Sequence, residues 1–171
     1  MTSDKKEENG EKGKEKKMKK EHVTEFKITD EHKWAVGFIE AEGEIGFNRG
    51  GAGTEEWKFM IKVVVKNTNR RAIARLKKII GVGKVFEDKA GAVVYRVTDR
   101  KHIEAGIYPI LDNYPPRGVK YYEYQILKKG MEVAKDPFKT AAEKSKILDE
   151  LKEESKKSKQ VTPVVSSRPM D

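Results

Sequence analysis

The chain has 171 residues, of which 38% are charged, and it carries a net charge of +9 with a pI near 9.5. This length suffices for one domain with a buried core. The absence of cysteine excludes disulfides and cysteine zinc sites. At a mean hydropathy of −0.79, no apolar run of membrane-spanning length and no secretory signal is visible, so we expect an intracellular protein.

A positive charge of this size points to a polyanionic partner, usually nucleic acid, rather than to a membrane or a small-molecule substrate. The first twenty residues hold eight lysines against five acidic residues. This lysine-rich start explains only part of the excess, and the rest lies further along the chain. The charged, glutamine-poor composition also resembles that of proteins from thermophiles.

Both ends of the chain are expected to be tails around one domain. Residues 1–23 contain almost nothing that could be buried and are predicted to be disordered. Residues 160–171 carry two prolines and no periodicity. The sequence therefore predicts a single domain over residues 24–159.

In chain order, the domain begins with a helix over about 30–42, which Thr29 and Asp30 can cap. A strand over about 44–49 follows, and a glycine-rich turn leads to a second strand over about 56–66. This second strand alternates between an apolar face and a mostly basic face. Its apolar face consists of Trp57, Phe59, Ile61, Val63 and Val65.

The second half repeats one helix and two strands and then adds helices. A helix over about 69–80 is capped by Thr68 and ends at Gly81. The later elements are strands over about 84–88 and 92–98, a helix from Thr98 or Asp99 to about Leu111, a helix over about 119–133 and one from Asp136-Pro137 onward. This order, αββαββα, predicts an α+β fold with a curved four-stranded antiparallel sheet and C-terminal helices.

The first predicted helix contains the segment AVGFIEAEG, which combines small residues with two acids at the helix end. Gly37 and Ala41 are four residues apart and share a helix face, which lets two helices approach closely. Trp34 and Phe38 can cover the seam between them. Glu42 lies at the C-terminal helix end, where an acid is unfavourable unless a cation compensates, so two such helices together predict a divalent metal site.

This segment resembles the LAGLIDADG motif, and the chain resembles single-motif LAGLIDADG homing endonucleases of the homodimeric, intron-encoded type. The residues that match outright are Gly37, Ala41 and Gly43. Glutamates at 40 and 42 replace the two aspartates, and the first two positions depart from the motif. The resemblance covers about residues 25–135 and includes KNTNRRAIARLKKIIGVGKV after the second strand. The alternative is that Glu40 and Glu42 are exposed acids at an ordinary helix end.

The motif occurs once, so one chain cannot supply both acids and a C2 homodimer with the motif helices at its axis is expected. Its interface residues would be Trp34, Gly37, Phe38 and Ala41. The resemblance implies that Glu42 and the Ala41 carbonyl bind Mg²⁺, which Mn²⁺ or Ca²⁺ can replace for binding. It also implies double-strand cleavage of a long pseudo-palindromic DNA target, leaving short 3′ overhangs.

The basic face of the second strand, with lysines at 58, 62 and 66, suits the major groove of double-stranded DNA. By parity, three residues of the other strands share this face. The predicted DNA-binding residues are Asn48, Lys58, Lys62, Lys84 and Arg96. The alternative is that the lysines only guard an ordinary half-exposed strand.

The resemblance further implies basic residues around the scissile phosphate. Besides Glu42, the catalytic residues by alignment are Lys66, Arg70 and Lys120. Lys66 departs from the glutamine that is common in the family. For Arg70 and Lys120 the alternative is an ordinary surface position.

Two other functions are compatible with the same fold. One is an RNA-binding intron maturase, and the other is a nuclease-dead DNA-binding regulator. Retention of both motif acids favours an endonuclease over a protein that only binds.

Overall fold

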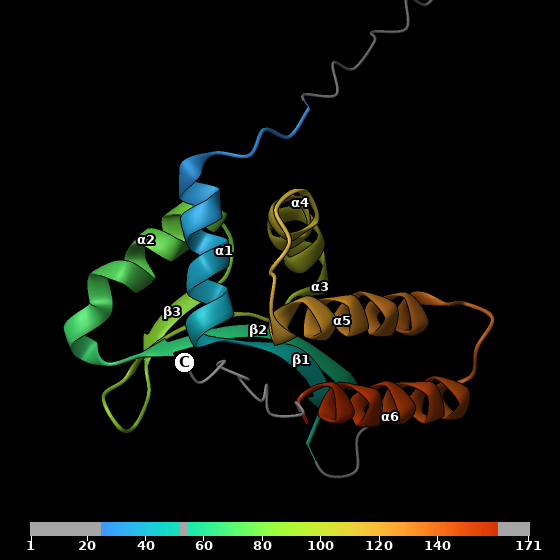
Figure 1. Ribbon diagram of the computed structural model, residues 1–171. Helices are drawn as coiled ribbons and strands as arrows, with labels where there is room; N and C mark the ends of the chain where they lie inside the picture. The colour runs from blue at the N-terminus through green and yellow to red at the C-terminus, as the bar shows by residue number, and fades with distance from the viewer. Residues whose placement is uncertain (1–24, 52–54, 161–171) are drawn as a thin grey trace, which may run out of the picture.

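The computed structural model describes residues 25–51 and 55–160 (Figure 1). The tail predicted over 1–23 and the part of the C-terminal tail beyond residue 160 lie outside the described residues. The domain bounds 24–159 stay a prediction. The elements are α1 (Asp30–Glu42), β1 (Gly43–Arg49), β2 (Trp57–Val65), the 3₁₀ turn η1 (Asn67–Asn69), α2 (Arg70–Ile80), β3 (Lys84–Glu87), β4 (Val93–Val97), α3 (Arg100–His102), the π-helical segment η2 (Ile103–Ile107), α4 (Tyr108–Asn113), α5 (Val119–Lys135) and α6 (Ala141–Ser158).

The four strands form one antiparallel sheet in the order β1-β2-β4-β3. Figure 1 shows α1, α2 and α4 over one face of this sheet, while α5 and α6 lie toward its β1 end. The α+β fold and the αββαββα order predicted from the sequence are confirmed. Among the described residues the opposite face of the sheet is left uncovered by helices, since the even-numbered side chains of β1 and β2 are exposed or half-buried.

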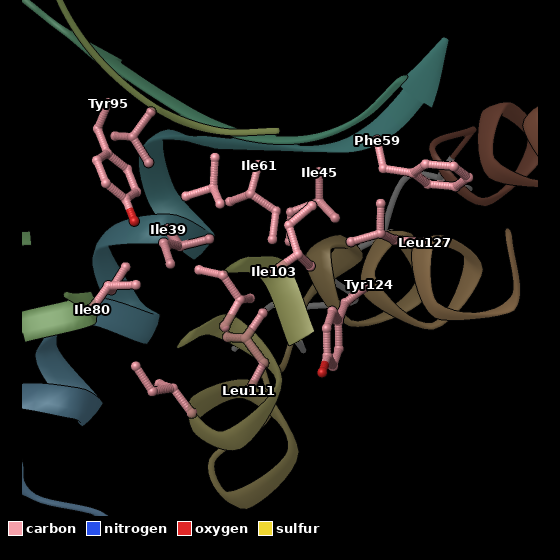
Figure 2. Close-up of a cluster of buried hydrophobic side chains, with 14 of the residues drawn as sticks. Ile39, Ile45, Phe59, Ile61, Ile80, Tyr95, Ile103, Leu111, Tyr124 and Leu127 are labelled. Carbon is pink, nitrogen blue, oxygen red and sulfur yellow. The ribbon is translucent and has the colours of Figure 1, made fainter. Parts of the chain in front are cut away.

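The core fills the space between the helices and the covered face of the sheet (Figure 2). All five apolar residues predicted on one face of β2 are buried. Ile39 of α1, Ile103 of η2 and Tyr124 of α5 reach the same cluster from three directions. Burial of these side chains removes apolar surface from water, which stabilises the fold by about 25 cal/mol per Å² buried. This is the main contribution that holds the helices on the sheet.

Two helix starts differ from the prediction. Asn69, not Thr68, occupies the N-cap of α2, because a 3₁₀ turn separates the helix from β2. The last helix begins at Ala141, and its N-cap Thr140 forms a capping box with Glu143. The Asp136-Pro137 pair instead forms a turn, in which the Asp136 carboxylate accepts a hydrogen bond from the Phe138 backbone N–H at 2.9 Å.

The helix predicted to end near Leu111 is also interrupted. Asp99 caps it as expected, since its side chain accepts a hydrogen bond from the His102 backbone N–H at 3.0 Å. The segment then widens into the π-helical turn η2 before α4. Gly106 lies in this wide turn, where a Cβ would meet the Val82 side chain, so the turn packs closely against the exit of α2.

Candidate active site and nucleic-acid interface

Helix α1 carries a stripe of exposed and half-exposed residues, of which Trp34 and Phe38 also pack against the edge of the core. This stripe consists of Trp34, Gly37, Phe38 and Ala41, the four residues predicted to form a dimer interface. The Trp34 and Phe38 rings stack at 5.1 Å. A Cβ built on Gly37 would meet nothing within 4 Å, so the packing of this chain alone gives no reason for a glycine there. The stripe is therefore open to another surface.

The two motif acids have different surroundings. Glu42 is the last residue of α1 and is exposed, and the last turn of the helix contains no basic residue. Glu40 is half-buried, and its carboxylate accepts hydrogen bonds from the backbone N–H groups of Arg117, at 3.0 Å, and Gly118. Glu40 thus fixes the chain just before α5, while Glu42 remains available at the helix end.

Gly43 makes the sharp passage from α1 into β1. A Cβ at this position would overlap the Ile39 carbonyl, which accepts the hydrogen bond from the Gly43 backbone N–H. Only glycine permits this close approach. The helix end with Glu42 is consequently held at one end of the sheet, next to the point where β2 finishes, because Gly43 pairs with Val63.

The three basic residues assigned by alignment lie near this end of the sheet or on α5. Lys66 follows β2 directly and is exposed. Arg70 forms an ion pair with Glu87 of β3, and its Nε donates to the Asn67 side chain at 3.2 Å. Lys120 lies in the first turn of α5, two residues after the segment that Glu40 holds.

Lys120 is also linked to a buried carboxylate that the sequence did not single out. Glu123 is 2% exposed and is the one charged residue that the structure buries within its described part. Its Oε2 lies 3.2 Å from the Lys120 Nζ, and its Oε1 lies 2.8 Å from the Lys159 Nζ beyond α6. Lys120 is thereby tied into a three-residue charge cluster.

The uncovered face of the sheet holds a row of charged residues across all four strands. The register aligns Lys62 with Arg96 and Arg96 with Lys84, and it places Asn48 opposite Lys58. The shared face predicted by parity is confirmed. The row also contains Glu44, which lies opposite Lys62 and forms an ion pair with it at 2.8 Å. The alternation in β1 places Glu44 on the same face as Asn48, so the sequence pattern contains the signal for this residue.

The model of the family described as LAGLIDADG endonuclease matches residues 35–131. The chain belongs to this family. The match begins inside the motif helix and ends in α5, so it spans Glu42, the sheet, Lys120 and every residue of the exposed stripe except Trp34. The predicted family membership is confirmed, whereas α6 lies beyond the matched segment.

Relatives and solved structures agree with this assignment. The chain is 30% identical over 134 residues to a probable intron-encoded endonuclease, Cox1-I1b, of Schizosaccharomyces pombe. This alignment covers 77% of this chain and 35% of the relative. The chain thus spans about a third of that curated relative. The LAGLIDADG homing endonuclease I-GzeII, solved in complex with its DNA target, superposes with a TM-score of 0.64 at 21% identity, covering 75% of this chain and 45% of that one.

A shorter neighbour has the same fold at nearly full length. The homing endonuclease I-TnaI superposes with a TM-score of 0.53 at 13% identity, covering 74% of this chain and 99% of its own. At these identities the solved structures establish the fold alone. Among the described helices, none is long and apolar enough to cross a membrane.

Proposed function

We propose that the chain is a homing endonuclease that acts as a homodimer and makes metal-dependent double-strand breaks in a long, pseudo-palindromic DNA target. One spatial relationship carries this proposal. The exposed stripe of α1 runs toward Glu42, an exposed acid at the end of the helix. This helix end lies at one end of the sheet, and the outer face of the sheet is basic. The stripe provides a dimer axis, the acid a metal ligand and the sheet a DNA-binding surface. DNA as substrate also fits the intracellular location expected from the sequence.

The geometry of α1 supports the dimer. Its residues Gly37 and Ala41 present almost no side chain outward, so a second copy of α1 can approach closely. A C2 axis through this stripe brings the two copies of Glu42 together. In the described part of one chain, no three His, Asp or Glu side chains form a group that could hold a metal ion, which is consistent with a centre assembled from two chains.

The donor set at the end of α1 suits a hard divalent cation such as Mg²⁺, with Mn²⁺ or Ca²⁺ able to replace it for binding. Glu42 provides a carboxylate, and Ala41 lies in the last helical turn, whose carbonyl groups lack intrahelical partners. A divalent cation held by these groups would supply an activated water molecule and charge stabilisation for the leaving oxygen. This chain's own contribution is to bring two carboxylates and two negative helix ends to one point.

The basic residues near this end of the sheet would act on the scissile phosphate. Lys120, 20% exposed, offsets negative charge that develops on the phosphate, and its ammonium is held by Glu123. Arg70 can contribute in the same way from the start of α2, although its pairing with Glu87 partly neutralises it. Lys66, exposed directly after β2, would hold water, although it departs from the glutamine that is common in the family.

The outer face of the sheet would read the DNA in the major groove. Strand β2 has nine residues, which at about 3.3 Å per residue spans roughly 30 Å, or about nine base pairs of a half-site. Lysine and arginine donors in the row suit guanine edges, while Glu44 can accept from cytosine. The DNA bound to I-GzeII supports double-stranded DNA as the partner, and the curated relative supports an intron-encoded origin.

The test is to incubate the full chain with Mg²⁺ and a randomised duplex library and to sequence the cut ends. We expect symmetric cut sites with short 3′ overhangs, and no cutting by Glu42→Gln, which should still bind DNA. DNA binding without any cutting by the parent protein would instead indicate a nuclease-dead regulator. Binding to structured RNA without DNA cleavage would indicate a maturase.

A further inference from the structure

Helix α6 lies beyond the family match, and its charges are segregated between two sides. Residues Asp149, Glu150, Glu153 and Glu154 lie together on one side, where Lys157 is their basic neighbour. The other side carries Lys152, Lys156 and Lys159, spaced by four and three residues and so on one helix face. We call this second side the basic face of α6. The two sides meet at Lys156, whose Nζ pairs with the Glu153 carboxylate at 2.6 Å.

The basic face of α6 borders the DNA-facing side of the sheet. Together with β1 it lines a cleft of about 310 Å³, into which the outward residues Glu44, Gly46 and Asn48 of β1 also open. Lys152 donates a hydrogen bond from its Nζ to the Asn48 side-chain oxygen at 2.9 Å. The cleft is therefore continuous with the face that we assign to DNA.

The helix is held firmly in this position. The Arg49 guanidinium pairs with Asp149 at 2.6 Å, and the Trp57 indole N–H donates to the Ser145 hydroxyl at 3.1 Å. Leu148 is completely buried against the core. Three kinds of contact thus fix the lysines relative to β1.

The cleft carries a surplus of positive charge. Lys120 and Lys159 share the single carboxylate of Glu123, and Glu44 is paired with Lys62. Lys156 is paired with Glu153, whereas Lys152 has only a neutral amide as its hydrogen-bond acceptor there. One more anion would therefore be stabilised among these lysines.

We propose that the cleft between β1 and the basic face of α6 binds a backbone phosphate of the DNA, so that α6 extends the DNA-binding surface beyond the sheet. Lysine ammonium groups suit a phosphate, because they are point charges without a fixed pattern for reading base edges. The volume accommodates a phosphate group with several water molecules, each of which occupies about 30 Å³. This inference rests on the proposed function, because DNA must lie against the open face of the sheet.

The experiment measures binding of the full chain to a random-sequence DNA duplex between about 50 and 200 mM salt. Lys152→Met should weaken binding and lower the slope of log K against log salt by about 0.9, and the double variant with Lys156→Met should lower it by about twice as much. Lys157→Met is the matched control, since it removes the same charge from the acidic side of the same helix. Lys152→Arg should keep the parental slope.

The outcomes separate the inference from the proposed function. A Lys157→Met slope equal to that of Lys152→Met would overturn the phosphate site, since only net charge would then matter. A parental slope in the double variant would also overturn it, while leaving DNA binding by the sheet intact. No salt-dependent DNA binding by the parent protein would refute the proposed function itself. Thermal unfolding of each variant checks that α6 stays docked.

Discussion

Glu40 and Gly118 lie 78 residues apart in the sequence, yet the Glu40 carboxylate of α1 accepts a hydrogen bond from the Gly118 backbone N–H at the start of α5. The neighbouring Arg117 N–H donates to the same oxygen at 3.0 Å. One acid of the motif therefore positions the helix that carries Lys120. Among the described residues the other acid, Glu42, makes no such contact, and it is exposed at the end of α1.

Glu40→Ala should destabilise the fold by about 2 kcal/mol, because two backbone donors lose a charged acceptor. It should also reduce cleavage through displacement of Lys120. Glu40→Gln keeps one acceptor oxygen and should lose less stability. Chemical denaturation of both variants measures the difference, and equal stability of Glu40→Ala and the parent would show that the contact is dispensable.

Gly37→Leu should separate folding from dimerisation. Space around Gly37 is open within one chain, and replacing glycine in a helix with leucine favours the helix by about 0.5–1 kcal/mol. The isolated chain should therefore remain folded or gain stability. In a C2 dimer the leucine meets its own copy, so the variant should sediment as a monomer and fail to cut DNA. A fully active dimer would disprove the assigned axis.

Lys62→Ala should weaken DNA binding and alter base preference at one symmetric pair of target positions. Its ammonium lies on the outer face of β2, paired with Glu44 at 2.8 Å. The expected loss of discrimination is about 1–3 kcal/mol at the affected base pair. Lys78→Ala is the control, because this exposed lysine belongs to α2 on the covered side of the sheet. Target selection from a randomised library should leave the Lys78→Ala preference unchanged.

The buried Glu123 carboxylate should be energetically coupled to Lys159. We expect Glu123→Gln to lower the melting temperature, because two lysines lose their shared carboxylate. Adding Lys159→Met to Glu123→Gln should then cost little more. A double-mutant cycle should give a coupling energy of about 0.5–3 kcal/mol. Strict additivity of the two substitutions would mean that Lys159 and Glu123 do not interact in solution.

Asp99 should make part of the stability depend on pH. The hydrogen bond from the His102 backbone holds the pKa of Asp99 below its ordinary value, helped by the nearby His102 and Lys101 charges. This stabilisation is present above the unfolded-state pKa and is lost as the pH falls through the folded-state pKa. Asp99→Asn keeps a capping oxygen but not the charge, so its melting temperature should fall less on acidification. An identical acid response in the variant and the parent would exclude this role.

Local patterns predicted most of the fold. The alternation of apolar and polar residues identified β2, and Gly43 and Gly81 identified the ends of α1 and α2. Each of these signals depends on only a few neighbouring residues. The start of α6 was mistaken, since Asp136-Pro137 and Thr140 with Glu143 are both acceptable helix starts. Which one is used depends on where the helix packs against α5.

Only the part of the candidate site that depends on local sequence could be predicted. Parity placed Lys62, Arg96 and Lys84 in one row, because strand geometry fixes the direction of every second side chain. The bonds from Glu40 to Gly118 and from Lys159 to Glu123 join distant segments, and no local spacing encodes them. The resemblance to the family identified Arg70 as a candidate catalytic residue, but it did not reveal the ion pair between Arg70 and Glu87.

The uncovered face of the sheet affects how the sequence of such a protein can evolve. Side chains such as Lys62 and Arg96 lie outside the core, so their replacement leaves the buried residues between them undisturbed. If this face reads DNA as proposed, a new target sequence can be acquired by substitutions that have little effect on the stability of the fold. The motif helix has less freedom, since one side of it packs in the core and Glu40 holds the start of α5. Under the proposed function, recognition can therefore diversify on this scaffold while the proposed metal site stays unchanged.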